Sequence, residues 1–238
     1  MGLAMATRFA AEGAHLMIGD WNAVRLEEAV RSIQASGGTV VGSHGDIGDQ
    51  STAEGLVDLA VNTYDRLDVL VNNAGVMDYM EGVGELSDDI WRRVMRINVD
   101  GPMFASRRAV QRMLVGGGGC IINIASIGGI RGGAAGAAYT TSKHALVGLT
   151  LNTAWMYAKR GVRCNAICPG ATRTNIGETM APDRIDQAGM ARAMAFAALA
   201  PAQLDASDIA DVALFLASDE GRHVNGALVS VDGGWSAV

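Results

Sequence analysis

The sequence has few cysteines and histidines and no long apolar run, and each shortage argues against a class of protein. Its three cysteines form no CxxC pair; this odd count without zinc spacing indicates buried thiols in a reducing compartment. The four histidines show no ligand spacing, and we assign no metal site. No apolar run approaches the roughly 20 residues that a membrane-spanning helix needs.

Positive charge is also scarce. The chain carries 19 lysines and arginines against 25 aspartates and glutamates, a formal net charge of -6. Nucleic acids and anionic membranes attract basic surfaces, so we expect neither as a partner. Arg8 and Glu12 interrupt the first residues before the apolar core of a signal peptide could form. These features together indicate a cytoplasmic protein.

What the sequence does contain is a repeated change between short apolar runs and longer helical patterns. The runs lie at 14–20, 39–47, 67–71, 120–126, 162–170 and 226–234. Each is continuously hydrophobic, which is typical of parallel strands covered by helices on both faces. With 238 residues, 49% of them apolar, we predict one α/β domain over 1–238. Its fold class is a three-layered, Rossmann-like, doubly wound parallel sheet.

Some helical segments carry more detailed signals. Ser51 and Glu54 have the spacing of a capping box, which predicts a helix over 51–65. Another helix is predicted over 88–115, with a break near Gly101-Pro102. Residues 175–205 break the alternation of strands and helices. Their apolar residues could form a mobile cover or the buried stripe of a short helix, and both interpretations stay open: Met180, Met190, Met194, Phe196 and Leu199.

The predicted strand ends carry polar or glycine-rich residues. In a doubly wound sheet, ligands bind beyond the C-terminal ends of the strands. A single polar strand end would be unremarkable, but five make a coherent pattern. These ends are Asp20, Asp46, the sequence NNAG at 72–75, Ser126 and Pro169-Gly170.

The clearest chemical signal is YTTSK, residues 139–143. Tyr139 and Lys143 are four residues apart, so they share one helix face. An ammonium about 4 Å from a phenolate stabilises it by roughly 4 kcal/mol at an effective dielectric constant near 20. That energy would lower the tyrosine pKa by up to about three units, toward neutrality. A bare YxxxK is usually an ordinary helix face, so its surroundings must decide.

Those surroundings resemble the classical short-chain dehydrogenase/reductase family over essentially the whole chain. Several motifs occur in the order that is typical of the family: NNAG, INVDG at 97–101, Ser126 before Tyr139 and Lys143, ICPGATRT at 167–174 and the terminal VSVDGG. The resemblance implies that Tyr139 is the general acid-base and that Lys143 lowers its pKa and holds the nicotinamide ribose. It implies that Ser126 binds the substrate oxygen and that Asn98 holds a helix kink and a water of a proton relay.

The resemblance also implies a set of cofactor contacts. A carboxylate at the position of Asp20 accepts hydrogen bonds from both ribose hydroxyls of NAD and repels the 2′-phosphate of NADP. We therefore favour NAD, although Arg25 lies only one helical turn further on. The full predicted set is Gly2, Asp20, Asp46, Ile47, Asn73, Ala74, Gly75, Tyr139, Lys143, Pro169, Gly170, Thr172 and Thr174.

From this we expect reversible hydride transfer between NAD(H) and a secondary alcohol or ketone, a small-molecule substrate. One alternative is NADP-dependent reduction of a 3-oxoacyl thioester. Another is a truncated, inactive, dehydrogenase-like interaction module. The resemblance implies a substrate lid at 175–205 and a homo-oligomer, dimer or tetramer, that pairs through helices near 99–115 and 144–160 and the last strand.

The opening, MGLAMATRF, departs from the family pattern. The family has a strand and then TGxxxGxG, and Gly2 matches the last of these glycines. We expect that Met1 is an internal methionine and that a strand of ~5–6 residues precedes it in the natural chain. Without that strand, the strands at 14–20 and 67–71 would flank a gap.

Overall fold

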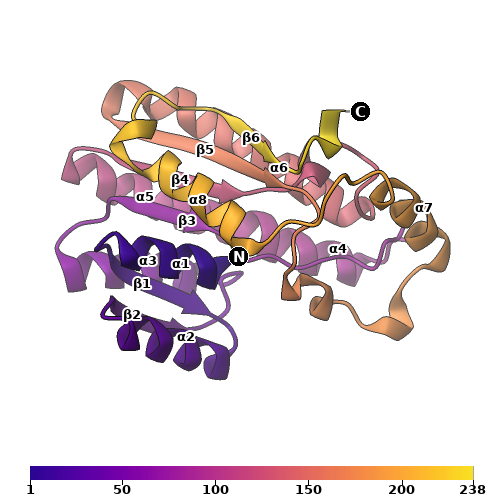
Figure 1. Ribbon diagram of the computed structural model, residues 1–238, viewed down its shortest axis with the longest axis horizontal. Coiled ribbons are helices and arrows are strands. Elements are labelled where there is room, and N and C mark those ends of the chain that lie inside the picture. The colour runs from indigo at the N-terminus through magenta and orange to yellow at the C-terminus, as the bar shows by residue number, and fades with distance from the viewer. Residues whose placement is uncertain (238) are drawn as a thin grey trace.

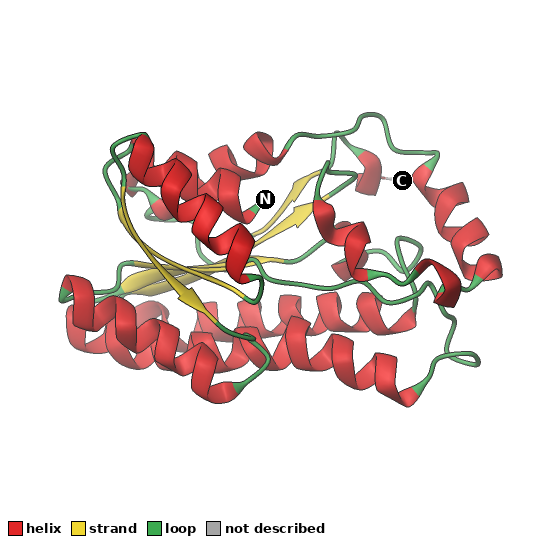
Figure 2. Cartoon of the chain, turned by 90° about the horizontal axis from the view of Figure 1, so that it is seen from below, coloured by secondary structure: helices red, strands yellow, loops and turns green. Residues whose placement is uncertain are grey.

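The computed structural model describes residues 1–237, which form parallel strands between two layers of helices (Figures 1 and 2). The predicted fold class is confirmed, and each predicted strand lies within three residues of its expected ends. The strands are β1 (His15–Asp20), β2 (Thr39–His44), β3 (Val69–Asn72), β4 (Gly119–Ile124), β5 (Val162–Pro169) and β6 (Leu228–Val231).

The strands form two parallel sheets. One contains β1 and β2, and the other has the order β3-β4-β5-β6. No strand pairing joins β1 to β3 within residues 1–237, which agrees with the expected gap between these strands. Side chains cover this region, because Leu16, Val69 and Val71 pack on one apolar cluster with Met5 and Phe9.

Helices cover both faces of the strands. On one face α1 (Gly2–Ala11) packs against α8 (Ala206–Ala217), and α2 (Ala23–Ala35) follows β1. On the other, α3 (Gln50–Tyr64) packs against α5 (Gly101–Gly116), beside α6 (Ala137–Tyr157). Successive residues of β4 point to opposite faces of the sheet. Ile122 packs on the face covered by α1 and α8, and Ile121 on the face covered by α5 and α6. This is the two-sided burial expected from continuously apolar strands.

The helix predicted over 88–115 changes its winding but does not break. It consists of α4 (Asp88–Met95), a π-helical turn η1 (Arg96–Asp100) and α5. The predicted break at Gly101-Pro102 is therefore wrong, and the irregularity lies just before it. Pro102 is tolerated because it stands at the start of α5. Gly101 is required by a close approach, because a Cβ there would lie 2.8 Å from the carbonyl oxygen of Ile47.

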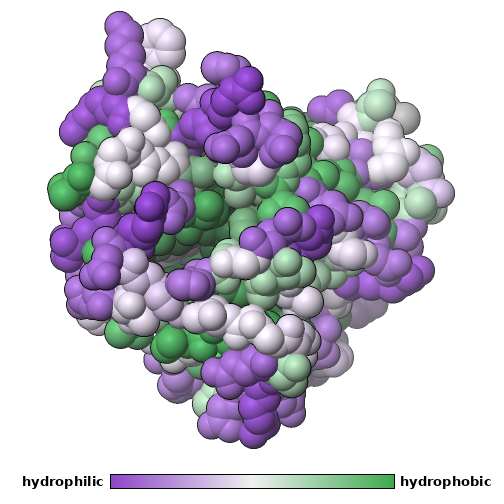
Figure 3. Space-filling view, turned by 60° about the vertical axis from the view of Figure 1, so that its left-hand side comes forward, coloured by the Kyte–Doolittle hydropathy of each residue, from purple (hydrophilic) through white to green (hydrophobic). Residues whose placement is uncertain are grey.

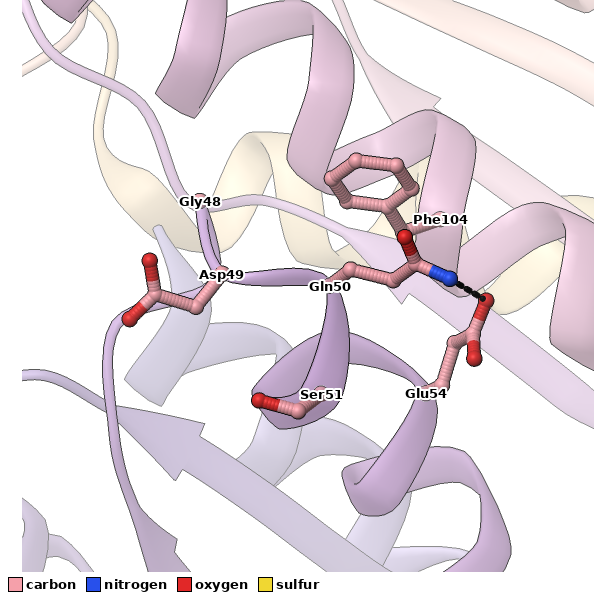
Figure 4. Close-up of a pocket in the computed structure, with 6 residues that line it drawn as sticks. All are labelled: Gly48, Asp49, Gln50, Ser51, Glu54 and Phe104. Carbon is pink, nitrogen blue, oxygen red and sulfur yellow. Dashed lines mark hydrogen bonds between the residues drawn. The ribbon is translucent and has the colours of Figure 1, made fainter.

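The capping box predicted for α3 is also wrong. The helix begins one residue early, with Asp49 at its N-cap. Glu54 instead accepts hydrogen bonds from Gln50 Nε2 at 3.1 Å and from Arg107 at 2.6 Å. Figure 4 shows the Gln50–Glu54 bond at the edge of a shallow pocket that none of the four predicted catalytic residues lines. The Glu54 carboxylate binds Arg107 of α5 instead of a backbone N–H at the start of α3, because the arginine supplies a full positive charge.

Residues 175–205, the predicted lid, contain η4 (Asn175–Thr179), η5 (Pro182–Arg184) and α7 (Gln187–Ala197). Figure 1 places α7 at the right-hand end, beyond the C-terminal ends of the strands. The sequence analysis missed α8, although Asp205 and Asp208 form a capping box ahead of it. The remaining short helices are η2 (Ile127–Gly129), η3 (Ala158–Arg160), η6 (Asp219–Gly221) and η7 (Trp235–Ala237). None of the helices within residues 1–237 has both the length and the hydrophobicity to cross a membrane.

Candidate active site

The four predicted catalytic residues converge at the C-terminal end of β4. Tyr139 and Lys143 lie one turn apart near the start of α6, and Ser126 follows β4 directly. The Ser126 side chain hydrogen-bonds to Tyr139 and accepts the Gly128 N–H at 3.0 Å. Tyr139 and Lys143 are both buried, so their polar groups lie in a water-poor environment. The sequence spacing is therefore realised as a contact between a hydroxyl, a phenol and a lysine.

Lys143 is held by the end of β4. Its Nζ donates a hydrogen bond to the carbonyl oxygen of Ile124 at 2.9 Å and lies 5.5 Å from the centre of the Tyr139 ring. Burial lowers the pKa of Lys143 to about 8, partly offset by the neighbouring Cys168 thiol, which raises it. The ammonium therefore loses its proton more easily here than in water.

The pKa of Tyr139 differs from the expectation. Burial raises it to about 12; the hydrogen bond from Ser126 lowers it and the negative charge of Asp78 raises it. The predicted lowering by Lys143 is not seen, because Lys143 Nζ lies beside the ring and donates to Ile124. In the protein alone, desolvation of the phenol outweighs the charge that the YxxxK spacing provides.

Asn98 lies in the π-helical turn η1 and is buried. Its side chain accepts the Val76 N–H and donates to the Val76 carbonyl oxygen, both at 2.9 Å, and donates to Ser142 Oγ at 3.0 Å. Asn98 thus ties the loop after β3 to α6, the helix that carries Tyr139 and Lys143. The water relay implied for Asn98 stays a prediction.

The loop after β3 approaches Lys143 closely at Gly75. A Cβ at Gly75 would lie 3.3 Å from Asn98 Oδ1 and 3.5 Å from Lys143 Nζ. The neighbouring Asn73 has its Oδ1 buried, with no hydrogen-bond partner among residues 1–237. A Cβ at Gly2 would lie 2.7 Å from Asn73 Nδ2, so the start of α1 meets this same loop. The unpartnered Asn73 oxygen suits a hydrogen-bond donor such as a ribose hydroxyl, and the nearby N-terminus of α1 at Gly2 suits a phosphate, so the two together fit a dinucleotide.

The predicted adenosine side lies at the ends of β1 and β2. Asp20 is exposed and accepts the Asn22 N–H at 2.8 Å. Asp46 is half-buried, and its carboxylate binds the Gly48 N–H at 2.8 Å and Arg96 at 2.6 Å. Burial raises the pKa of Asp46, but these two donors outweigh burial and the net pKa is lowered. Ile47 is half-buried and the loop residue Ala74 is exposed.

The predicted nicotinamide segment follows β5. Pro169 ends this strand, and Gly170 passes so close to the last strand that a Cβ there would lie 2.7 Å from Asp232 Cβ. Thr172 Oγ1 donates to the Gly170 carbonyl oxygen at 3.2 Å. Thr174 caps η4 by accepting the Ile176 N–H at 3.4 Å. The segment therefore runs from the sheet directly into residues 175–205, the predicted lid.

The surroundings of Tyr139 on the lid side are apolar. Away from this side, on the face that Figure 3 brings forward, the surface is mostly hydrophilic and has a hollow with hydrophobic residues at its floor. The cluster that contains Tyr139 joins the loop after β3 to the lid, and its other members are Met77, Met80, Ala135, Ile176, Met180, Met190 and Ala193.

Two carboxylates at this site were missed by the sequence analysis. Glu178 of η4 pairs with Arg25 of α2 at 2.5 Å, and this ion pair connects the lid to the predicted ribose site. Asp78 is fully buried beside the start of α6. Neither had a usable signal, because each is a single acidic residue, and the contacts that place Glu178 on α2 and Asp78 on α6 span at least 58 positions.

Comparisons with known proteins agree with this geometry. A family model described as enoyl-(acyl carrier protein) reductase matches residues 1–236. A 3β-hydroxysteroid dehydrogenase 2 from Eggerthella lenta is 41% identical over 238 residues, which span all of this chain and 91% of the relative. The chain belongs to the classical short-chain dehydrogenase/reductase family.

Other members extend the comparison. A meso-2,3-butanediol dehydrogenase from Serratia marcescens is 37% identical over 240 residues, covering all of this chain and 90% of that protein. The crystal structure of levodione reductase has a TM-score of 0.90 at 32% identity and covers all of this chain and 93% of its own. A candidate gluconate 5-dehydrogenase from Beutenbergia cavernae, with NADP bound at low occupancy, has a TM-score of 0.86 at 35% identity, covering all of this chain and 92% of its own. This chain is an NAD(P)-dependent alcohol dehydrogenase or ketoreductase, which speaks against the interaction-module alternative.

Proposed function

We propose that this enzyme transfers a hydride between NAD(H) and an uncharged, largely apolar secondary alcohol or ketone, with Tyr139 as the general acid-base. The observation that carries the proposal is the buried arrangement of Ser126, Tyr139 and Lys143 below an apolar cluster. The methionines of this cluster favour an apolar substrate such as the hydroxysteroid named for the Eggerthella lenta relative.

The residues would act as follows. The bound nicotinamide supplies a hydride acceptor at its C4 atom. Ser126, already hydrogen-bonded to Tyr139, donates to the substrate oxygen and stabilises the charge that develops there. Tyr139 takes the hydroxyl proton in oxidation and returns it in reduction. Lys143 holds the nicotinamide ribose, and its lowered pKa lets it pass a proton toward Asn98.

The cofactor would be held by residues whose surroundings fit it. Gly2 lies against Asn73, whose unpartnered oxygen would accept a hydrogen bond from the cofactor, and Gly75 would leave room for it beside Lys143. Asp20 would hold the adenosine ribose, and Asp46 with Ile47 the adenine. The segment Pro169, Gly170, Thr172 and Thr174 would hold the nicotinamide carboxamide. Ala74 would line the adenosine side, where its small side chain lets the backbone approach.

We propose NAD as the preferred cofactor. Asp20 is an exposed carboxylate at the ribose position and repels a 2′-phosphate. Arg25, the nearest cation on α2, is held by Glu178 at 2.5 Å. The ion pair draws the guanidinium toward the lid, so it is less free to bind a phosphate.

We further propose a homo-oligomer that works in the cytoplasm, with residues 175–205 as the substrate lid. The outer face of α6 carries exposed apolar side chains, Leu151, Trp155 and Met156, which support an interface on this helix. The three cysteines are buried and unpaired, which supports a reducing compartment.

The test of the proposed function is Tyr139→Phe. The variant keeps the ring but loses the proton-transferring hydroxyl, so kcat should fall by about 10²–10⁴-fold while the Kd for NAD stays within about threefold. Steady-state kinetics with a panel of apolar secondary alcohols and calorimetric titration of NAD measure both. Tyr157→Phe removes a hydroxyl on the same helix outside the site and should leave both values unchanged. Retention of more than about a tenth of the activity by Tyr139→Phe would refute the assignment.

A further inference from the structure

A short segment after β3, residues 77–81, holds the N-terminus of the catalytic helix. Within it Asp78 is fully buried, and its carboxylate accepts three backbone N–H groups. Its Oδ1 binds Met80 at 3.1 Å and Gly136 at 3.2 Å, and its Oδ2 binds Tyr139 at 2.8 Å. The N–H of Tyr139 itself is thus fixed by this side chain.

These contacts replace a cap that α6 does not provide. The N-cap of α6 is Gly136, which has no side chain to accept the free N–H groups of the first turn. Asp78 binds two of them, and the Glu81 carbonyl oxygen accepts a third from Ala137 at 2.8 Å. Glycine at 136 allows this approach, because a Cβ there would lie 2.6 Å from Asp78 Oδ2. A carboxylate also suits the positive end of the helix dipole.

The same segment carries the lid on its other side. The Met77 N–H donates to Thr179 Oγ1 at 2.9 Å, and the Asp186 N–H donates to the Tyr79 carbonyl oxygen at 2.9 Å. Segment 77–81 therefore lies between the lid and the helix turn that carries Tyr139. A displacement of Asp78 would therefore disturb both the lid and the first turn of α6.

We infer that Asp78 is a positioning residue, whose buried carboxylate holds the first turn of α6 and with it the phenol of Tyr139. This inference rests on the proposed role of Tyr139. The backbone bond to Tyr139 N sets where the phenol lies relative to Ser126 and Lys143. The charge of Asp78 raises the pKa of Tyr139, which burial also raises and the Ser126 hydrogen bond lowers.

Other titratable groups face this region from every neighbouring element, and their charges stay in place in the test. Lys143 lies on α6 and Cys168 on β5, next to each other. From the segment itself and from the lid, the groups are Glu81, Arg184 and Asp186, with Asp89 and Arg93 contributed by α4.

The test compares the pH dependence of kcat/KM for alcohol oxidation in Asp78→Asn and the wild type. Phenolate is the active form in oxidation, so activity rises with pH through the apparent pKa of Tyr139. Removing the negative charge lowers that pKa, and the midpoint should move down by about half to one pH unit. The variant also loses part of the N–H cap, so kcat should fall about tenfold. Glu85→Gln makes the same charge change at an exposed position of the same loop and should leave midpoint and kcat unchanged.

A second variant and a second measurement separate the outcomes. Gly136→Ala keeps the charge but displaces the carboxylate, so kcat should fall while the midpoint moves less than in Asp78→Asn; it also serves if Asp78→Asn does not fold. Amide hydrogen exchange at 136–139 should quicken at least about tenfold in either variant relative to Glu85→Gln. Unchanged exchange together with an unchanged midpoint would overturn the inference. A wild type inactive on every alcohol with NAD and NADP would refute the proposed function, while exchange would still decide the role of Asp78.

Discussion

At the scale of single residues, burial acts in opposite directions on the two partners of the YxxxK pair. It removes water from both, which lowers the pKa of Lys143 and raises that of Tyr139. In each case the neutral form is favoured. Burial therefore opposes both the phenolate of Tyr139 and the ammonium of Lys143.

The cost of burying Lys143 can be measured as stability. The pKa of Lys143 is about 8 in the folded state, against an ordinary value of 10.5 in the unfolded state. The folded protein therefore loses this proton at a lower pH than the unfolded chain. Stability therefore rises with pH between these values, because the unfolded state binds more protons there. Lys143→Met should raise the free energy of unfolding by roughly 1–2 kcal/mol at pH 7, with the gain shrinking as pH rises from 8 to 10. Urea unfolding at several pH values measures this, and a gain that does not change with pH would contradict it.

A second residue-scale prediction concerns cofactor choice. Glu178→Gln removes the partner of Arg25 from an exposed ion pair, which solvent screens and weakens. The freed guanidinium can then approach a 2′-phosphate, so the ratio of kcat/KM for NADP to that for NAD should rise about two- to fivefold. Glu27→Gln changes an exposed charge on α2 that pairs with Arg31 and serves as control. Equal ratios in the two variants would show that Arg25 plays no part in selectivity.

At the scale of elements, a buried network of amides and hydroxyls fixes α5 and α6 to the sheet. Asn72 Nδ2 at the end of β3 donates to Asn123 Oδ1 at 2.8 Å and to Ser106 Oγ at 3.0 Å. Asn123 Nδ2 of β4 donates to Thr150 Oγ1 at 2.8 Å. Buried polar groups are costly unless every one is bonded, so this network favours one placement of α6 over nearby ones.

Asn123→Ala should therefore destabilise the protein strongly. It leaves Asn72 and Thr150 each short of one buried partner and opens a small cavity, which together cost about 2–4 kcal/mol. Thermal unfolding followed by circular dichroism measures the change. Asn62→Ala, at an exposed position of α3, should change stability by less than about 0.5 kcal/mol. A similar effect of the two substitutions would mean that the network adds nothing.

At the scale of the whole molecule, two features remain without a partner inside residues 1–237. The facing edges of β1 and β3 are not paired with each other, and the outer face of α6 shows apolar side chains. The unpaired strand edges reflect the division of the strands into two sheets. The apolar face of α6 would suit the proposed interface with a second copy of the chain.

Trp155→Glu tests the proposed interface. Trp155 is 83% exposed on α6, so a carboxylate there costs little in a monomer but is costly in a dry interface. Light scattering after size-exclusion chromatography should show a wild-type dimer or tetramer and at least a tenfold weaker association of the variant. Val83→Glu, at an 86% exposed loop position, should leave association unchanged. A monomeric wild type would exclude the interface.

The sequence by itself determined the strand order along the chain, the helix periodicity and the polar strand ends, because these depend on local patterns. The tertiary structure decided the rest: Glu54 is taken by Arg107, Tyr139 is desolvated, and α6 is capped by Asp78. Each of these outcomes depends on which side chain, distant in the sequence, packs beside the group and on how much water it displaces. Neither quantity is encoded in spacing, so the sequence could predict which residues meet at the proposed catalytic site, whereas it could not predict the pKa of Tyr139 or the segment that holds its helix turn.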